Sequence, residues 1–72
     1  MLNDQELSRG YIQQAITRNY KVELYKEYNT YHVRRFSYFI DGQRTVTESW
    51  LIFHDVTRAR QAYKRQLELA KS

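Results

Sequence analysis

The stretch that decides the fold is residues 31–53, which read YHVRRFSYFIDGQRTVTESWLIF. Its middle contains Asp41-Gly42, a dipeptide that suits the two positive-φ positions of a type I′ hairpin turn. Aromatic and β-branched residues, which favour pleated surfaces, flank this turn on both sides. The sequence therefore predicts two antiparallel strands, over residues 31–40 and 43–53.

A two-residue turn would also fix the register of this hairpin. It would set five pairs of residues opposite each other: Ile40 and Gln43, Ser37 and Val46, Arg35 and Glu48, Val33 and Trp50, Tyr31 and Ile52. The last two pairs would then share the core face. The opposite face would carry His32, Arg34, Phe36, Tyr38, Thr45, Thr47, Ser49, Leu51 and Phe53. A bulge that shifts the register by one residue would exchange these faces over part of the strand.

The periodicity on either side of the hairpin predicts one more strand and a helix. Tyr20, Val22 and Leu24 alternate with Lys21 and Glu23, which indicates a strand over 20–27 with one buried face. Residues 28–30 are expected to form a tight connection to the next strand. Beyond the hairpin, Asp55 is placed to cap a helix over 56–70. Its apolar stripe consists of Val56, Ala59, Ala62, Tyr63, Leu67 and Ala70.

A second helix is predicted over residues 4–17. Asn3 and Glu6 have the spacing of a capping box, and an apolar stripe of Leu7, Tyr11, Ile12, Ala15 and Ile16 follows at helical spacing. The fold class predicted for residues 1–72 is therefore a single α+β domain of order α-β-β-β-α. Its three-stranded antiparallel meander packs with the two helices.

Composition narrows the class of protein further. The chain has 72 residues, a net charge of +4 and no Cys or Pro. No apolar run approaches the roughly 18 residues that span a bilayer, and the N-terminal residues lack the order of a signal peptide, so a cytoplasmic protein is expected. Packing of seven Tyr, three Phe and one Trp, or self-association, must supply the stability of so small a core.

No group of residues predicts catalysis, a cofactor or a metal site. His32 and His54 have no Cys or second His near them in a zinc-ligand pattern. Gly10 and Gly42 are isolated, so the chain has no Gly-rich phosphate loop. A non-enzymatic protein without a small-molecule substrate is expected.

The sequence instead suggests a binding surface with a nucleic acid or a protein as its partner. On one side of the predicted hairpin Arg34, Phe36 and Tyr38 lie with Thr45 and Thr47. Cations neutralise phosphates, hydroxyls bond to phosphates or base edges, and rings stack on bases, which suits nucleic acid. The alternative is that Phe36 and Tyr38 form a second buried layer beneath a helix, with Arg34 extending to water.

A second basic group lies on the predicted C-terminal helix, where it is also open to two interpretations. Its members are Arg58, Arg60, Lys64 and Arg65. They would serve either as further phosphate contacts or as an ordinary solvated helix face, with Lys64 and Glu68 as an i,i+4 pair.

A resemblance to a known family rests on two features. They are the order strand, Asp-Gly hairpin, strand and helix, and the segment WLIFHDVTRA at residues 50–59. The sequence resembles the three-stranded-sheet-plus-helix DNA-binding domain at the start of many phage and transposon integrases, over residues 31–67. In that family the sheet face enters the major groove, which implies DNA contacts for Arg34, Phe36, Tyr38, Thr45 and Thr47. The resemblance implies a phage or mobile-element accessory factor rather than a recombinase.

The competing interpretation is a protein-binding inhibitor or adaptor. Tyr25, Tyr28, Phe36 and Tyr38, like Arg residues, belong to the types enriched at protein hot spots. A homodimer is one form of this alternative, because burial of one sheet face against a second copy would stabilise a small core.

Overall fold

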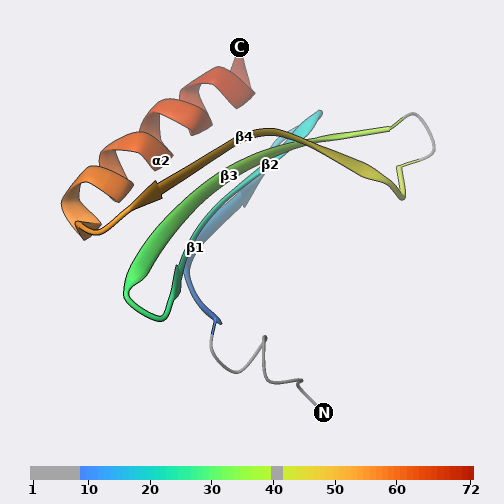
Figure 1. The fold of residues 1–72 in the computed structure, drawn as a ribbon. Helices are drawn as coiled ribbons and strands as arrows, with labels where there is room; N and C mark the ends of the chain where they lie inside the picture. Colours follow the sequence, from blue (N-terminus) through green and yellow to red (C-terminus); the bar gives the residue numbers. More distant parts are fainter. Residues whose placement is uncertain (1–8, 40–41) are drawn as a thin grey trace.

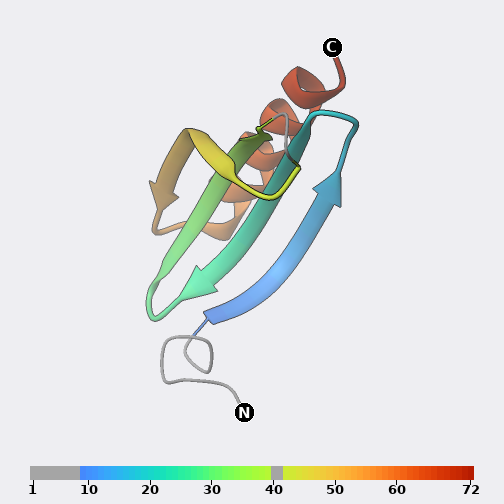
Figure 2. The same ribbon diagram turned by 90° about the vertical axis from the view of Figure 1, so that its right-hand side faces the viewer.

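The computed structural model describes residues 9–39 and 42–72. Within these ranges the chain forms four antiparallel strands in one sheet of order β1-β2-β3-β4, followed by one helix, α2. The elements are β1 Arg9–Ile16, β2 Tyr20–Glu27, β3 Thr30–Tyr38, β4 Thr45–Phe53 and α2 Val56–Lys71. Figure 2 looks onto the face of the sheet that is turned away from α2. The predicted α-β-β-β-α order is therefore wrong, and the observed order is β-β-β-β-α.

The prediction of a helix over residues 4–17 is wrong where the structure describes this segment, and residues 4–8 lie outside the described residues. Residues 9–16 pair with β2 as a strand. A bulge between Tyr11 and Gln13 interrupts the alternation of this strand. That extra residue places the apolar residues at spacings that resemble a helical stripe. Gly10 also disfavours a helix.

The hairpin between β2 and β3 lies where the sequence predicts it, but Thr30, predicted in the connection, is the first residue of β3. β2 spans the predicted 20–27, and Glu27 pairs with Thr30 across a two-residue turn. Tyr28 in this turn has a φ of 56°, in the left-handed region. The Thr30 hydroxyl closes the turn by donating to the Glu27 carbonyl at 2.9 Å.

The first half of the hairpin between β3 and β4 has the predicted register. Ser37 pairs with Val46, and the Phe39 amide donates to the Arg44 carbonyl at 2.9 Å. Gly42 has a φ of 71°, as a glycine in a tight turn permits. The predicted contacts of Ile40 and Asp41 lie outside the described residues.

The second half of this hairpin is shifted by one residue, which corrects the predicted pairs. A bulge places Glu48 between the pairs Phe36–Thr47 and Arg35–Ser49. Beyond it the partners are Arg34–Trp50, Val33–Leu51, His32–Ile52 and Tyr31–Phe53. Because a one-residue shift turns every side chain to the other face, Trp50 and Ile52 leave the predicted core face and Leu51 and Phe53 join it.

The expected charge pair between Arg35 and Glu48 does not form, for the same reason. Glu48 in the bulge accepts a hydrogen bond from the Ser37 hydroxyl at 2.7 Å. Arg35 instead points toward the helix, where its Nε donates to the side-chain oxygen of Gln66 at 2.8 Å. The bulge thus changes an expected cross-strand ion pair into a contact between sheet and helix.

The core lies between one face of the sheet and α2 (Figure 1). The helix begins as predicted, since Asp55 accepts a hydrogen bond from the Thr57 amide at 3.0 Å. Most of the predicted apolar stripe faces the sheet. The buried cluster consists of Val22, Leu24, Val33, Ala59, Tyr63 and Ala70, with Tyr20, Tyr31, Phe53, Ala62 and Leu67 packed against it. Among the described residues, no second helix covers the other face, which we call the open face.

Candidate functional site

The open face brings together five of the residues that the sequence singles out. Arg34, Phe36 and Tyr38 lie on β3, and Thr45 and Thr47 are the β4 partners of Tyr38 and Phe36. Both threonines are exposed, and both rings are partly buried. The described residues place no helix over Phe36 and Tyr38, so the predicted grouping on one face is observed and the layer beneath a helix is not.

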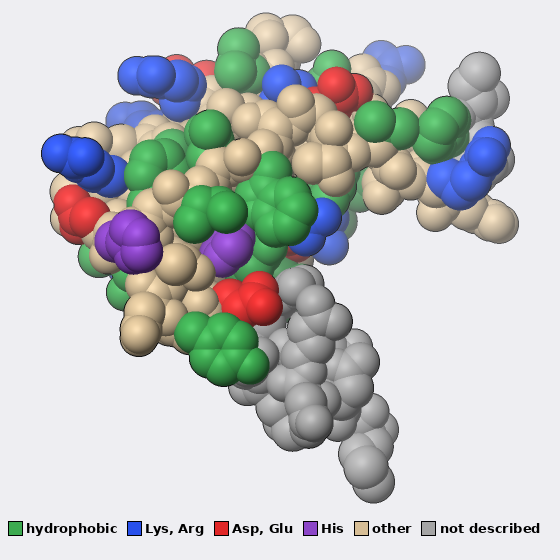
Figure 3. Space-filling view, viewed as in Figure 1, with side chains coloured by type: hydrophobic (Ala, Val, Ile, Leu, Met, Phe, Trp, Pro, Cys, Tyr) green, Lys and Arg blue, Asp and Glu red, His purple; other side chains and the backbone are tan. Residues whose placement is uncertain are grey.

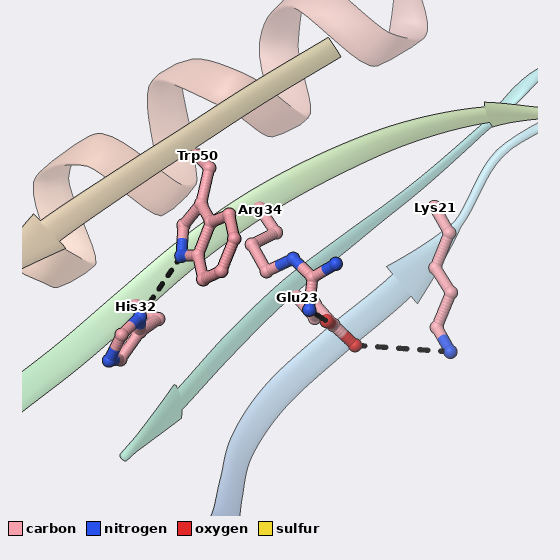
Figure 4. A network of polar contacts seen from close by, with 5 residues as sticks. All are labelled: Lys21, Glu23, His32, Arg34 and Trp50. Atoms are coloured by element: carbon pink, nitrogen blue, oxygen red, sulfur yellow. Dashed lines mark hydrogen bonds and ion pairs between the residues drawn. The ribbon is translucent and has the colours of Figure 1, made fainter. Parts of the chain in front are cut away.

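Arg34, however, is held by its neighbours on this face (Figure 4). One of its terminal nitrogens lies 3.8 Å from a carboxylate oxygen of Glu23, and its guanidinium lies 4.4 Å from the centre of the Phe36 ring and 4.7 Å from that of Trp50. The ammonium of Lys21 lies 4.0 Å from the other oxygen of Glu23. Glu23 is almost fully buried, and the Arg34 side chain is only 19% exposed. The positive charge of Arg34 is therefore compensated within the sheet.

Trp50 is anchored by a chain of hydrogen bonds. Its indole nitrogen lies 3.0 Å from Nδ1 of His32, whose Nε2 lies 2.8 Å from the Thr30 hydroxyl. Because an indole N–H can only donate, Nδ1 accepts, and Nε2 carries the proton that is donated to Thr30. The His32 ring also stacks on Tyr25, with ring centres 4.9 Å apart. This neutral histidine fixes one edge of Trp50, and Trp50 remains 53% exposed.

The basic residues of α2 do not join this face, and they separate into two groups. Residues two apart lie about 200° apart around a helix, so Arg58 and Arg60 point to opposite sides. Arg58 and Arg65 are two turns apart on the side next to β4, where both line a pocket with Leu51 and Phe53. Arg60 and Lys64 are one turn apart on the other side. All four are exposed, and the structure does not pair Lys64 with Glu68.

The strand β4 exposes several large apolar side chains, which the sequence analysis missed. Trp50 is 53% and Ile52 56% exposed on the open face, and Val46 and Leu51 are exposed on the helix face. Figure 3 views the molecule with β4 in front and shows hydrophobic side chains gathered over this strand. Sequence reasoning placed Trp50 and Ile52 in the core because the bulge at Glu48 leaves no clear signature in the sequence.

The backbone of β4 is paired on one side only among the described residues, because β4 is at the end of the strand order. The Tyr38 amide donates to Asn19, toward β2, and the Phe39 amide donates to Arg44, toward β4. Amide directions alternate along a strand, so the odd-numbered residues of β3 face β4. Their partners Ser49, Leu51 and Phe53 then turn their amides inward, and Trp50 and Ile52 turn theirs toward the open edge.

An open pocket of about 330 Å³ lies between the end of β4 and α2. Leu51, Phe53 and Ala62 provide its apolar surface, and Arg58, Gln61, Arg65 and Gln66 its polar surface. A second pocket of about 440 Å³ shares Phe53 and Arg58 with the first and continues past Ile52 and His54. We use the name β4 edge site for the exposed side chains of Trp50, Leu51 and Ile52, the outward amides of Trp50 and Ile52, and these two pockets.

The remaining features of the described residues assign no chemistry. They contain no group of three or more His, Cys, Asp or Glu side chains able to hold a metal ion. No helix in this part of the chain is long and apolar enough to cross a membrane. Burial raises the pKa of Tyr63 above its ordinary value of 10.0, and this residue belongs to the core.

Comparison of the chain with protein-family models, with curated proteins and with solved structures finds no match in any of the three. The resemblance to an integrase DNA-binding domain stays a hypothesis.

Proposed function

We propose that this chain is a non-enzymatic protein-binding domain that takes an extended segment of its partner as a fifth strand alongside β4. The observation that carries the proposal is the edge at Trp50–Phe53, which no other described strand pairs with and where outward amides lie between exposed apolar side chains and a pocket. In strand addition, backbone hydrogen bonds supply affinity and alternate side chains supply specificity. The β4 edge site offers both kinds of contact.

The fixed position of Trp50 supports this proposal energetically. Tryptophan is the residue type most characteristic of binding hot spots. A side chain that is already ordered loses little conformational entropy when a partner covers it. His32 and Arg34 hold Trp50 in the free protein, so its exposed ring presents a preorganised apolar contact.

The charges on the open face favour a protein over a nucleic acid as the partner there. Phosphate binding depends on cations that release counterions. Arg34 and Lys21, two cations of this face, share the carboxylate of Glu23. The contacts proposed for Arg34 with phosphates would require this buried ion pair to open.

The test selects short random peptides without tryptophan on the immobilised protein and then measures backbone protection. The chain has a single Trp, so the emission of Trp50 reports binding directly. Hydrogen exchange of the Trp50 and Ile52 amides is expected to slow in the complex, because the added strand accepts from them. Ile52→Pro, which removes one outward donor, is expected to lose binding, whereas Ile52→Val keeps the amide and retains most of it.

Two results would overturn the proposal. One is a set of selected peptides that bind Ile52→Pro as well as the original chain and leave the two amides unprotected. The other is a salt-sensitive increase in mass by light scattering with a mixed-sequence DNA duplex, unaffected by Ile52→Pro. That second result would assign the chain to nucleic-acid binding instead.

A further inference from the structure

The pocket beside β4 combines an apolar surface with two cations that have no partner in the described structure. Arg58 and Arg65 line it, and neither forms an ion pair or hydrogen bond with another described residue. By contrast, Arg34 and Arg35 on the sheet both have polar partners. Within the part of the chain that the structure describes, Arg58 and Arg65 therefore lie unpaired next to the strand edge, whereas Arg34 on the open face has a carboxylate partner.

This pocket lies where the side chains of a strand added to β4 would reach it. An added strand would lie about 4.8 Å beyond β4, and its side chains would alternate between the two faces of the sheet. Side chains on the helix face would point toward Arg58 and Arg65. Those on the open face would lie beside Trp50 and Ile52. The two sides of such a strand therefore meet different chemistry.

We propose that the segment bound at the β4 edge site is acidic on one face and apolar on the other. Its aspartate or glutamate side chains bind between Arg58 and Arg65, and its alternate apolar side chains cover Trp50 and Ile52. This inference rests on the proposed strand addition and adds the chemical class of the partner. Guanidinium groups bind carboxylates with two parallel hydrogen bonds, so the pair selects acidic residues over amides.

The experiment compares peptides selected from the same random library on three forms of the protein. The original chain is expected to enrich peptides that alternate acidic and apolar residues. Arg58→Gln combined with Arg65→Gln is expected to bind an enriched peptide about tenfold more weakly. The matched control is Arg60→Gln combined with Lys64→Gln. It removes two positive charges from the other side of α2 and is expected to leave affinity within about twofold, because those charges lie away from the bound segment and salt screens them.

A second comparison changes the peptide instead of the protein. Replacing its acidic residue by the corresponding amide is expected to weaken binding to the original chain about tenfold and to the Arg58/Arg65 double variant by less than about twofold. This non-additivity would assign the carboxylate to the two arginines.

The outcomes separate this inference from the function on which it rests. Selected peptides without acidic enrichment that still protect the Ile52 amide would overturn the acidic partner and leave strand addition intact. Equal losses in the two double variants would also overturn it, since net charge alone would then explain the effect. A dimeric mass that acidic peptides do not reduce would show that a second copy occupies the edge. Peptide binding that does not depend on the Ile52 amide would instead refute strand addition itself.

Discussion

Proline substitutions at two neighbouring positions of β4 test which backbone amides face the open edge. The inferred alternation turns the Leu51 amide toward Val33 and the Ile52 amide away from the sheet. Proline has no amide hydrogen and is tolerated in a sheet mainly where that hydrogen would face solvent. Leu51→Pro and Ile52→Pro are therefore expected to differ sharply in stability although they are adjacent.

The size of the difference follows from what each position contacts. Leu51→Pro removes an inward donor and leaves a carbonyl of the fully buried Val33 without its partner. The lost bond and the unpaired carbonyl together cost about 2–4 kcal/mol. Ile52→Pro loses only part of a side chain that is already 56% exposed, which costs about 1 kcal/mol. A small domain with a total stability of about 5 kcal/mol survives the second loss far better than the first.

Urea unfolding measures both variants, with the emission of Trp50 and the far-ultraviolet circular dichroism as independent probes. The midpoint of Ile52→Pro is expected to lie close to that of the original chain. The midpoint of Leu51→Pro is expected to fall steeply, or the variant to be unfolded in water. Equal losses, or a greater loss for Ile52→Pro, would refute the assigned amide directions and remove the basis for strand addition at Ile52.

Two further substitutions test the open face and the core. Glu23→Gln leaves Lys21 and Arg34 without their shared carboxylate. It is expected to lower the free energy of unfolding, measured with urea, by about 1–3 kcal/mol. An unchanged midpoint would show that these ion pairs contribute nothing to stability. Because the pKa of Tyr63 is raised by burial, the folded chain keeps a proton that the unfolded chain loses above pH 10.0. The contribution of Tyr63 to the free energy of unfolding is therefore fully present below that pH. It declines as the pH rises through the pKa of Tyr63 in the folded chain, by at most about 1.4 kcal/mol per pH unit. Tyr63→Phe is expected to decline less over this alkaline range, and an identical decline would exclude Tyr63 as its cause.

The parts of the fold that the sequence predicts are those with an uninterrupted period. The strand Tyr20–Glu27 alternates throughout, and the helix Val56–Lys71 has a capping aspartate and a continuous apolar stripe. Local chemistry determines both, and the structure confirms both. The β3–β4 pairs near the turn match the prediction, but the Phe39 amide bonds to the Arg44 carbonyl and the Gly42 amide to the Phe39 carbonyl, so the turn is not the predicted two-residue one.

The parts that the sequence misassigns contain a bulge. In β1 the extra residue near Ile12 makes an edge strand resemble a helix. In β4 the extra residue Glu48 moves Trp50 and Ile52 from the predicted core face to the open face. The face of Arg34, Phe36 and Tyr38 is predicted correctly because β3 itself is regular. Bulges depend on pairing with a neighbouring strand, so a pattern read along one segment does not reveal them.

The two edges of the sheet differ in a way that favours β4 as the binding edge. An exposed strand edge invites pairing with other chains, and proteins commonly block it with charges or bulges. In β1 the bulge lies mid-strand, and α2 packs against β2, β3 and β4. In β4 the bulge at Glu48 lies ahead of Ser49–Phe53, a segment that is regular, carries no charge and is adjacent to the helix. Among the described residues, the β4 edge combines a regular unpaired backbone with an adjacent helix, so a fifth strand here would gain both hydrogen bonds and side-chain burial.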